Sequence, residues 1–448
     1  MEGGAAPEKD CAPRCRMSEN NVGGVTAQTG SSDQQQRSDD TITVVFTADN
    51  HLGYTTFGQQ PRKREERQQR LRRAFQQATD FAVGQGVDLF VQAGDLFDST
   101  TPDERDRSFV SARLAQLRQA GVHVFALGGV HDTPAETHSL PGDAAQAPQV
   151  SYAHLDVMHY FPPNPAELEP VMVNIRDVLI GICGLGVLPG QEGNPLTRIH
   201  ERSDIERAAV PILLLHAPIE GLATGRSLLD RRAQVSRSSI EDQTLFRYIL
   251  AGYHHSYQHL HIGQCEAIVA GATQHIDFSD PDQEPGFVFL GLAADGIRWC
   301  KHIVVDSLKL QRLLLQTSEL WPDGTSTTAS TTDSILERLQ PLCSEETMVQ
   351  LRLEGQMTRG QYHQLDLNQI RRYGEEHCFA LAIDDSGLEI LPELEAISAE
   401  TGERFSPREE LMALADEWIA AAHDDQEKKA LRATKEDLLA AMDEVKRR

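Results

Sequence analysis

The order of apolar and polar residues along the chain predicts an α/β fold. Short apolar runs at residues 42–49 (ITVVFTAD), 87–95 (VDLFVQAGD) and 122–129 (VHVFALGG) are separated by two segments whose apolar residues recur at helical spacing, residues 71–82 and 103–121. Strands that are so short and so continuously apolar are typical of sheets covered on both faces. The alternation of strands and helices therefore predicts an α/β sheet.

The same pattern continues to about residue 305 and then changes. Further strands are predicted at residues 177–186 (DVLIGICGLG), 210–217 (VPILLLHA) and 247–253 (RYILAGY). A hairpin-like segment over residues 267–297 is expected to close the sheet layer, so that a first domain covers residues 41–305. Residues 306–390 combine apolar runs with a Ser/Thr-rich loop, which predicts a small α+β domain.

The two ends of the chain differ from this body. Residues 1–40 are rich in Gly, Ser, Gln, Asn and Asp and poor in large apolar side chains, so they are expected to form a disordered tail. Residues 391–448 contain two amphipathic helices, the first with a start signature at Ser406, Pro407 and Glu409. These helices either fold back on their own domain or dock on a partner, and the sequence leaves both open.

Charge limits how this chain can bind nucleic acid. The formal net charge of −25 argues against binding by bulk electrostatics alone. Residues 62–73 (RKREERQQRLRR) nevertheless carry seven basic residues against two acidic ones. Such a run is usually the solvated face of a helix, and the alternative is a patch in which Arg62, Lys63 and Arg64 contact phosphates.

Apolar segments and cysteines indicate the compartment. No stretch approaches the ~20 consecutive apolar residues of a membrane-spanning helix, and the beginning of the chain lacks the apolar core of a signal peptide. The seven cysteines are scattered without metal-ligand spacing, so reduced thiols are expected. We therefore expect a cytoplasmic protein with no membrane partner.

Acidic and imidazole side chains follow the predicted strands, at the point where each strand ends. Ligands bind beside the carboxyl ends of the strands in an α/β sheet, so these side chains are expected to converge. Two ionised carboxylates about 4 Å apart repel by about 4 kcal/mol at the effective dielectric of proteins, and a bound cation would relieve this repulsion. Mixed carboxylate and imidazole ligands suit manganese, iron or zinc better than magnesium or calcium. The residues concerned are Asp49, His51, Asp95, His131, Asp132, His216, His254 and His255.

Five motifs at these strand ends, ADNHLGY, GDLFD, GVHD, LLHAP and GYHHSYQ, occur in the order and approximate spacing of the calcineurin-like metallophosphoesterases. The chain resembles more closely the SbcD-type nuclease subunits of DNA double-strand-break repair. The resemblance covers residues 41–305 and continues more weakly through residues 306–390. It implies a four-layer sandwich of two mixed sheets flanked by helices, a small α+β capping domain that contacts DNA, and C-terminal helices that dock on an SbcC-type coiled-coil ATPase. It also implies a homodimer.

The resemblance assigns metal ligands by position. The first ion would be held by four residues: Asp49, His51, Asp95 and His255. The second ion would share Asp95 and use His216, but Val130 stands at the position of an asparagine ligand and Tyr253 at that of a histidine ligand. Valine has no lone pair, and a neutral phenol is a poor ligand. We therefore expect one manganese ion to bind firmly and a second weakly or not at all, unless His254 replaces the missing histidine.

His131 and Asp132 complete the predicted site. By the resemblance, His131 approaches the scissile phosphate and either stabilises the transition state or protonates the leaving oxygen, while Asp132 holds its ring. The leading hypothesis is thus a metal-dependent DNA phosphodiesterase. Val130 and Tyr253 favour an alternative, a pseudo-nuclease that serves as a scaffold for DNA ends or for the ATPase. A third hypothesis, a phosphoesterase for small molecules or nucleotides, is permitted by the fold.

Overall fold

The computed structural model describes residues 40–55, 60–134, 146–165, 167–188, 190–199, 204–222, 233–280, 282–321 and 328–391, with short helical stretches between residues 412 and 438. Residues 1–39 of the expected tail and the helix start at residues 406–409 lie outside the described residues. The chain divides into two compact units, Met1–Glu354 with Asp366–Gly387, and Gly355–Leu365 with Leu388–Arg448. The first unit contains all the residues of the candidate site.

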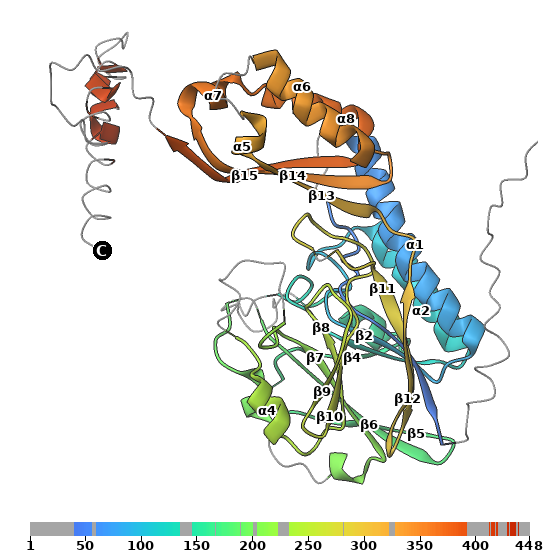
Figure 1. The fold of residues 1–448 in the computed structure, drawn as a ribbon. Helices are drawn as coiled ribbons and strands as arrows, with labels where there is room; N and C mark the ends of the chain where they lie inside the picture. Colours follow the sequence, from blue (N-terminus) through green and yellow to red (C-terminus); the bar gives the residue numbers. More distant parts are fainter. Residues whose placement is uncertain are drawn as a thin grey trace, which may run out of the picture. The chain divides into compact units, whose positions relative to one another are not determined.

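Six strands form a first mixed sheet in the order β12-β11-β1-β2-β3-β4. Its parallel strands β1 to β4 are Ile42–Thr47, Leu89–Ala93, His123–Leu127 and His159–Phe161. β11 (Gly286–Ala293) pairs antiparallel with β1 and with β12 (Gly296–Val304). The helices α1 (Pro61–Gln85) and α2 (Glu104–Gln119) connect the first three strands and lie side by side (Figure 1). The predicted alternation of strands and helices is therefore confirmed.

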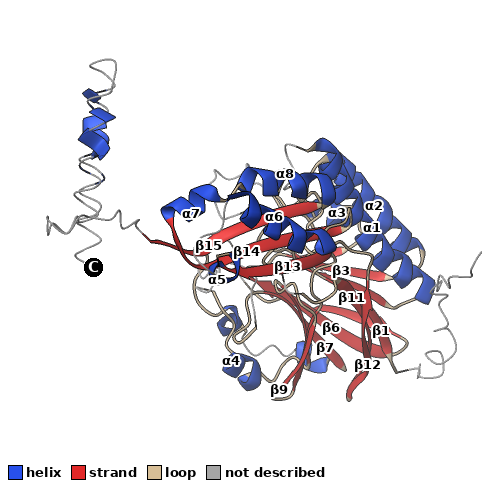
Figure 2. Ribbon diagram, turned by 45° about the horizontal axis from the view of Figure 1, so that its top comes forward, coloured by secondary structure: helices blue, strands red, loops and turns tan. Residues whose placement is uncertain are grey.

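Six further strands form a second mixed sheet in the order β5-β6-β7-β8-β10-β9 (Figure 2). Its central strands β6, β7, β8 and β10 are parallel, and β5 and β9 pair antiparallel at the two edges. In chain order, β5 to β10 are Val171–Ile175, Val178–Gly186, Val210–His216, Tyr248–Gly252, Gln258–Ile262 and Cys265–Val269.

Apolar side chains hold these layers together. Val44 and Phe46 of β1 join the buried cluster between the two sheets, whereas Val45 joins the cluster that contains Phe75 of α1. This alternation follows from the two-residue period of a strand. A third cluster covers the other face of the second sheet and includes α4 (Arg237–Asp242). The layers are thus helix, sheet, sheet and helix, as expected for a metallophosphoesterase sandwich.

Residues 267–297 do not form the hairpin predicted from the sequence. β10 ends at Val269 in the second sheet, where it pairs with β8, whereas β11 begins at Gly286 in the first sheet, where it pairs with β1. The hairpin instead joins β11 to β12. Apolar content does not reveal which sheet a strand joins, and the pattern also missed the short or half-exposed strands β4, β5 and β9.

A smaller sheet in the order β13-β14-β15 follows the sandwich. Its strands are Lys309–Gln316, Thr347–Thr358 and Ala380–Leu391, and the helices α5 to α8 are Thr317–Leu320, Thr328–Leu339, Arg359–Gln364 and Leu367–His377. The remaining short helices are α3 (Val150–His154) and the 3-10 turns Pro195–Arg198, Ile205–Arg207 and Gln340–Leu342. Residues 306–390 therefore have the mixed α and β content that the sequence predicts.

Cys343 and Cys378 form a disulfide in this smaller part. The expectation of reduced thiols is therefore wrong for this pair, whereas Cys183, Cys265 and Cys300, the other cysteines among the described residues, are not in disulfides. The pair lies 35 residues apart in the sequence, and only the tertiary fold brings the two sulfurs together. Among the helices in the described part of the chain, none combines the length and the apolar character needed to cross a membrane.

Candidate metal centre

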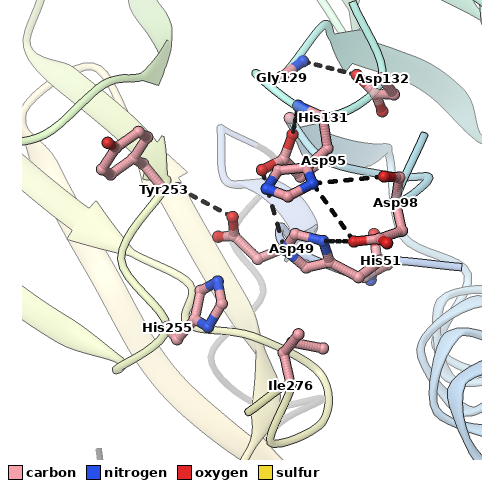
Figure 3. A network of polar contacts seen from close by, with 12 residues as sticks. Asp49, His51, Asp95, Asp98, Gly129, His131, Asp132, Tyr253, His255 and Ile276 are labelled. Carbon is pink, nitrogen blue, oxygen red and sulfur yellow. Dashed lines mark hydrogen bonds and ion pairs between the residues drawn. The ribbon is translucent and has the colours of Figure 1, made fainter. Parts of the chain in front are cut away.

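The carboxyl ends of parallel strands from both sheets deliver polar side chains to one place (Figure 3). Three combinations of these side chains each place one potential ligand atom per residue within 4.8 Å of one another. The combinations are Asp49–His51–His255, His51–Asp95–His131 and Asp49–Asp95–His216. The structure thus brings together six of the eight residues that the sequence placed at strand ends: Asp49, His51, Asp95, His131, His216 and His255.

The backbone turns sharply at these strand ends. Asp49, His51 and Asp95 have φ angles of 49°, 46° and 53°, in the left-handed region that residues with a side chain rarely adopt. The backbone N–H of Asp49 donates to the carbonyl oxygen of Gly94 at 3.0 Å, which fixes the first of these turns. Gly129 must be a glycine, because a Cβ there would lie 2.2 Å from the backbone nitrogen of Asp95. Backbone strain of this kind persists where the surrounding structure enforces it, as at functional sites.

Each of the three imidazoles opposite the carboxylates is anchored through its Nδ1 atom. The three anchoring pairs are His51 with Oδ1 of Asp98 at 3.0 Å, His255 with Oδ1 of Asp280 at 2.6 Å, and His216 with the carbonyl oxygen of Ala93 at 2.8 Å. An Nδ1–H that donates to oxygen leaves the Nε2 lone pair for a metal, which is the usual arrangement around metal-binding histidines. The Nε2 atoms of His51 and His216 and the Oδ2 atom of Asp49 are buried without a hydrogen-bond partner. These atoms are suited to bind a cation.

The electrostatics of the cluster also favours a cation. The Oδ2 atom of Asp95 lies 3.3 Å from Nε2 of His216 and 3.9 Å from Nε2 of His51. Burial raises the pKa of Asp49 and lowers the pKa of His51, since both charged forms lose water. Burial opposes the charged forms of Asp95 and His216 as well, but their mutual attraction outweighs it, so the pKa of Asp95 is lowered and that of His216 is raised to about 9. The buried carboxylates therefore favour a positively charged group or ion beside them.

Comparison with known protein families agrees with this geometry. Residues 42–234 match the family described as calcineurin-like phosphoesterase. This part of the chain is a calcineurin-like phosphoesterase domain. Members of this family use divalent metals, and the clustered side chains described above are of the types that bind them.

Individual relatives match a shorter part of the chain. The DNA double-strand break repair protein Mre11 of Methanosarcina mazei is 35% identical over 99 residues, which are 22% of this chain and 15% of that protein. The protein of the same name from Thermoplasma acidophilum is 34% identical over 88 residues, 19% of this chain and 22% of that protein. The chain therefore matches less than a quarter of the length of these relatives. A solved dimetal phosphatase from Danio rerio covers 59% of this chain and 99% of its own, with 12% identity and a TM-score of 0.34.

Val130 directly precedes His131 in the chain, and Tyr253 lies beside Asp49 and His216. Both side chains are half-buried and pack against the apolar cluster on the outer face of the second sheet. The backbone N–H of Tyr253 donates to Oδ1 of Asp49 at 3.2 Å (Figure 3). The phenol ring lies 5.5 Å from the ring of His216. Neither Val130 nor Tyr253 belongs to a residue type that offers a metal-binding atom at neutral pH.

His254 belongs to none of the three combinations of potential ligands found among the described residues. Its side chain is buried, and its Nε2 atom accepts a hydrogen bond from the backbone N–H of Ile219 at 2.9 Å. To act as the replacement ligand considered from the sequence, His254 would have to give up this bond and leave a buried N–H unpaired.

We therefore expect His254→Leu to leave the Mn²⁺ affinity unchanged while lowering the free energy of unfolding by about 1–3 kcal/mol, the usual cost of one unpaired buried polar group. His255→Leu at the neighbouring position is the matched control and should weaken Mn²⁺ binding strongly. Isothermal titration with Mn²⁺ and urea unfolding of the metal-free proteins measure the two quantities. Loss of Mn²⁺ binding in His254→Leu at unchanged stability would make His254 a ligand.

The corner that carries His131 and Asp132 is fixed by hydrogen bonds to its backbone. Asp132 is buried and accepts hydrogen bonds from the backbone N–H of Gly129 at 2.8 Å and of Phe97 at 3.2 Å. Burial, together with the charge of Asp95, raises the pKa of Asp132 to about 7. Asp132 therefore holds the backbone of the surrounding loops, whereas the resemblance predicts that it holds the imidazole ring of His131.

Asp98 lies beside the ring of His131 instead. The Nδ1 atom of His131 is 3.4 Å from Oδ1 of Asp98, which also contacts Nδ1 of His51 at 3.0 Å. The backbone N–H of His131 donates to Oδ1 of Asp95 at 2.8 Å, and its ring lies 4.8 Å from the ring of His51. His131 is therefore placed next to the candidate metal ligands, with a quarter of its side chain exposed.

The basic stretch at the start of α1 has several separate roles. Arg62 and Arg64 are exposed. Lys63 donates from Nζ to the carbonyl oxygens of Glu375 and Cys378, at 2.9 Å each. Its ammonium group is therefore hydrogen-bonded to the backbone at the end of α8. Contact with phosphate stays a prediction for Arg62 and Arg64, and for Lys63 it would compete with these bonds.

Proposed function

We propose that this chain is a divalent-metal-dependent phosphodiesterase that cuts DNA. One observation carries the proposal: buried Nε2 atoms of His51 and His216 and Oδ2 of Asp49 lack hydrogen-bond partners at the same place. An unpaired buried polar group costs about 1–3 kcal/mol, so several of them at one point suggest that a ligand completes them. A cation with borderline ligand preference, such as manganese, iron or zinc, suits imidazole nitrogens and carboxylate oxygens together.

Each candidate residue receives a role in this proposal. The first ion would be held by four residues: Asp49, His51, Asp95 and His255. A second ion would share Asp95 and, of the ligands that the resemblance predicts for it alone, would have only His216, so its binding would be weak. When bound, a divalent ion supplies Lewis-acid polarisation of the phosphoryl oxygen. His131 would donate a proton to the leaving oxygen, and Asp98 would hold the imidazole ring in place.

DNA is the proposed substrate because the matching relatives are named as DNA double-strand break repair proteins. The resemblance to SbcD-type subunits adds an SbcC-type coiled-coil ATPase as a partner and a homodimer as the assembly. Residues 391–448 would provide the docking segment for the ATPase. Co-expression of an SbcC-type ATPase with the full chain and with residues 1–390 tests this, and equal recovery of the ATPase with both chains would contradict it.

The experiment that tests the activity combines two measurements on one purified sample. Metal content per chain is measured by mass spectrometry, and cleavage of linear DNA is followed with and without Mn²⁺. We expect His131→Ala to keep its metal and to lose about 10²–10⁴-fold in rate, the usual contribution of a general acid. Rapid cleavage of nucleotides without cleavage of DNA would instead support the small-molecule phosphoesterase.

A second candidate function is a scaffold that binds DNA ends without cutting them. It is favoured by Val130 and Tyr253, which offer no donor atom where the resemblance predicts two ligands. A scaffold should bind the ends of linear DNA with no turnover at any Mn²⁺ concentration. In that case His131→Ala would change neither DNA binding nor the absence of cleavage.

A further inference from the structure

One loop lies between a candidate metal ligand and the smaller sheet. Residues 274–280 lie between β10 and β11, and Asp280 in this loop is buried. Oδ1 of Asp280 lies 2.6 Å from Nδ1 of His255, so this carboxylate orients the imidazole that would bind the first ion. Oδ2 of Asp280 accepts the backbone N–H of Ile276, which fixes the carboxylate to its own loop (Figure 3 shows Ile276 beside His255). The position of this loop therefore sets the position of His255.

Arg312 of β13 holds the same loop from the smaller sheet. Its Nη2 atom donates to the carbonyl oxygens of Phe278, at 3.1 Å, and of Asp280, and its Nη1 atom forms an ion pair with Asp282. Its Nε atom donates to Oε1 of Gln350 on β14 at 3.3 Å. One planar guanidinium thus connects two strands of the smaller sheet to the backbone of Asp280 itself.

The other side of the loop is held by the phosphoesterase domain. Arg67 of α1 is fully buried, and its Nη2 atom donates to the carbonyl oxygen of His275 and lies 3.5 Å from that of Ile276. Arg67 therefore fixes the start of the loop to the sandwich, whereas Arg312 fixes its end to the smaller sheet. Arg312 thus joins the end of the loop that carries Asp280 to the smaller sheet.

We propose that Arg312 is a positioning residue that makes the affinity of the first metal site depend on the smaller sheet. The connection runs from β13 through Arg312 to the backbone of Asp280, and from its carboxylate to His255. Removing the guanidinium releases the end of the loop, and the carboxylate then no longer holds the imidazole in one orientation. The inference rests on the proposed metal-binding function, and it adds a route by which a ligand of the smaller sheet would change metal affinity.

Mn²⁺ titration of the full chain, followed by the electron paramagnetic resonance of free Mn²⁺, tests this directly. We expect Arg312→Gln to weaken binding at the tightest site about tenfold, the lower end of the range for loss of a residue that supports a metal ligand. Arg352→Gln is the matched control, since Arg352 on β14 is half-exposed and pairs with Glu354 and Asp384 instead of the loop. Equal affinity of wild type and Arg312→Gln would overturn the inference, whereas a wild type that binds no Mn²⁺ would overturn the proposed function itself.

A double variant separates positioning from general destabilisation. Asp280→Asn should weaken Mn²⁺ binding about 10–100-fold by itself. If Arg312 acts through Asp280, adding Arg312→Gln to Asp280→Asn should produce little further loss. Fully additive losses would contradict the proposed connection. Arg312→Lys keeps the charge without the planar fork and should recover part of the affinity, and it replaces Arg312→Gln should that variant fail to fold.

Discussion

Replacing Asp95 with asparagine is expected to abolish Mn²⁺-dependent DNA cleavage, with a loss of about three orders of magnitude or more. Asp95 belongs to two of the three combinations of potential ligands, and its Oδ2 atom lies 3.9 Å from Nε2 of His51 and 3.3 Å from Nε2 of His216. Asparagine keeps the shape but removes the negative charge that attracts a divalent ion. A loss of about 4 kcal/mol in transition-state stabilisation corresponds to about 10³ in rate.

The effect of the same substitution on metal binding is measurable without any substrate. A ligand that binds only the folded state stabilises it by about 2.7 kcal/mol when its concentration is 100 times its dissociation constant. Wild type should therefore gain this stability in Mn²⁺, as measured by urea unfolding, and Asp95→Asn should gain much less at the same concentration. Asp88→Asn, at the opposite end of β2, is the matched control and should respond to Mn²⁺ like wild type. An undiminished response of Asp95→Asn would remove Asp95 from the metal site.

Much of the fold and of the candidate site follows from local pattern. Each short apolar run before a polar residue marks a strand end, so the sequence alone predicts the positions of Asp49, Asp95 and His216 at strand ends. Because parallel strands end at the same edge, their convergence also followed. The family resemblance then identifies Val130 and Tyr253 as the two positions near these strand ends where an expected metal ligand is missing.

The groups that orient the site could not be predicted in this way. Asp98 lies in the GDLFD motif and Asp280 in a turn-rich segment, but nothing local indicates that each contacts a histidine far along the chain. Lys63 shows the same limit, because its position in a basic run suggests phosphate whereas its partners are two distant carbonyl oxygens. Contacts between segments far apart in the sequence depend on how the layers pack, and residue spacing carries no record of that. The Cys343–Cys378 disulfide was missed for the same reason.

The double substitution Val130→Asn with Tyr253→His is expected to raise the number of Mn²⁺ ions per chain from about one to about two and to increase cleavage about tenfold, or ~1.4 kcal/mol of the barrier. An asparagine oxygen and an imidazole nitrogen would then join Asp95 and His216 around the second ion. The backbone permits the change: Tyr253 has a φ of 78°, and histidine tolerates the left-handed region better than most residues. Metal analysis and the DNA cleavage assay measure the two effects.

The matched control is Val130→Ala with Tyr253→Phe, which alters both side chains without adding a donor atom. Both side chains pack against the same apolar cluster, so this control includes any loss of stability from repacking that cluster. It should leave metal content and cleavage rate at or below those of wild type. A rise in the donor variant alone would mean that the second site lost its ion through these two positions. Unchanged metal content in both variants would mean that Val130 and Tyr253 do not occupy ligand positions, and the second site would then be weak for a reason other than these two side chains.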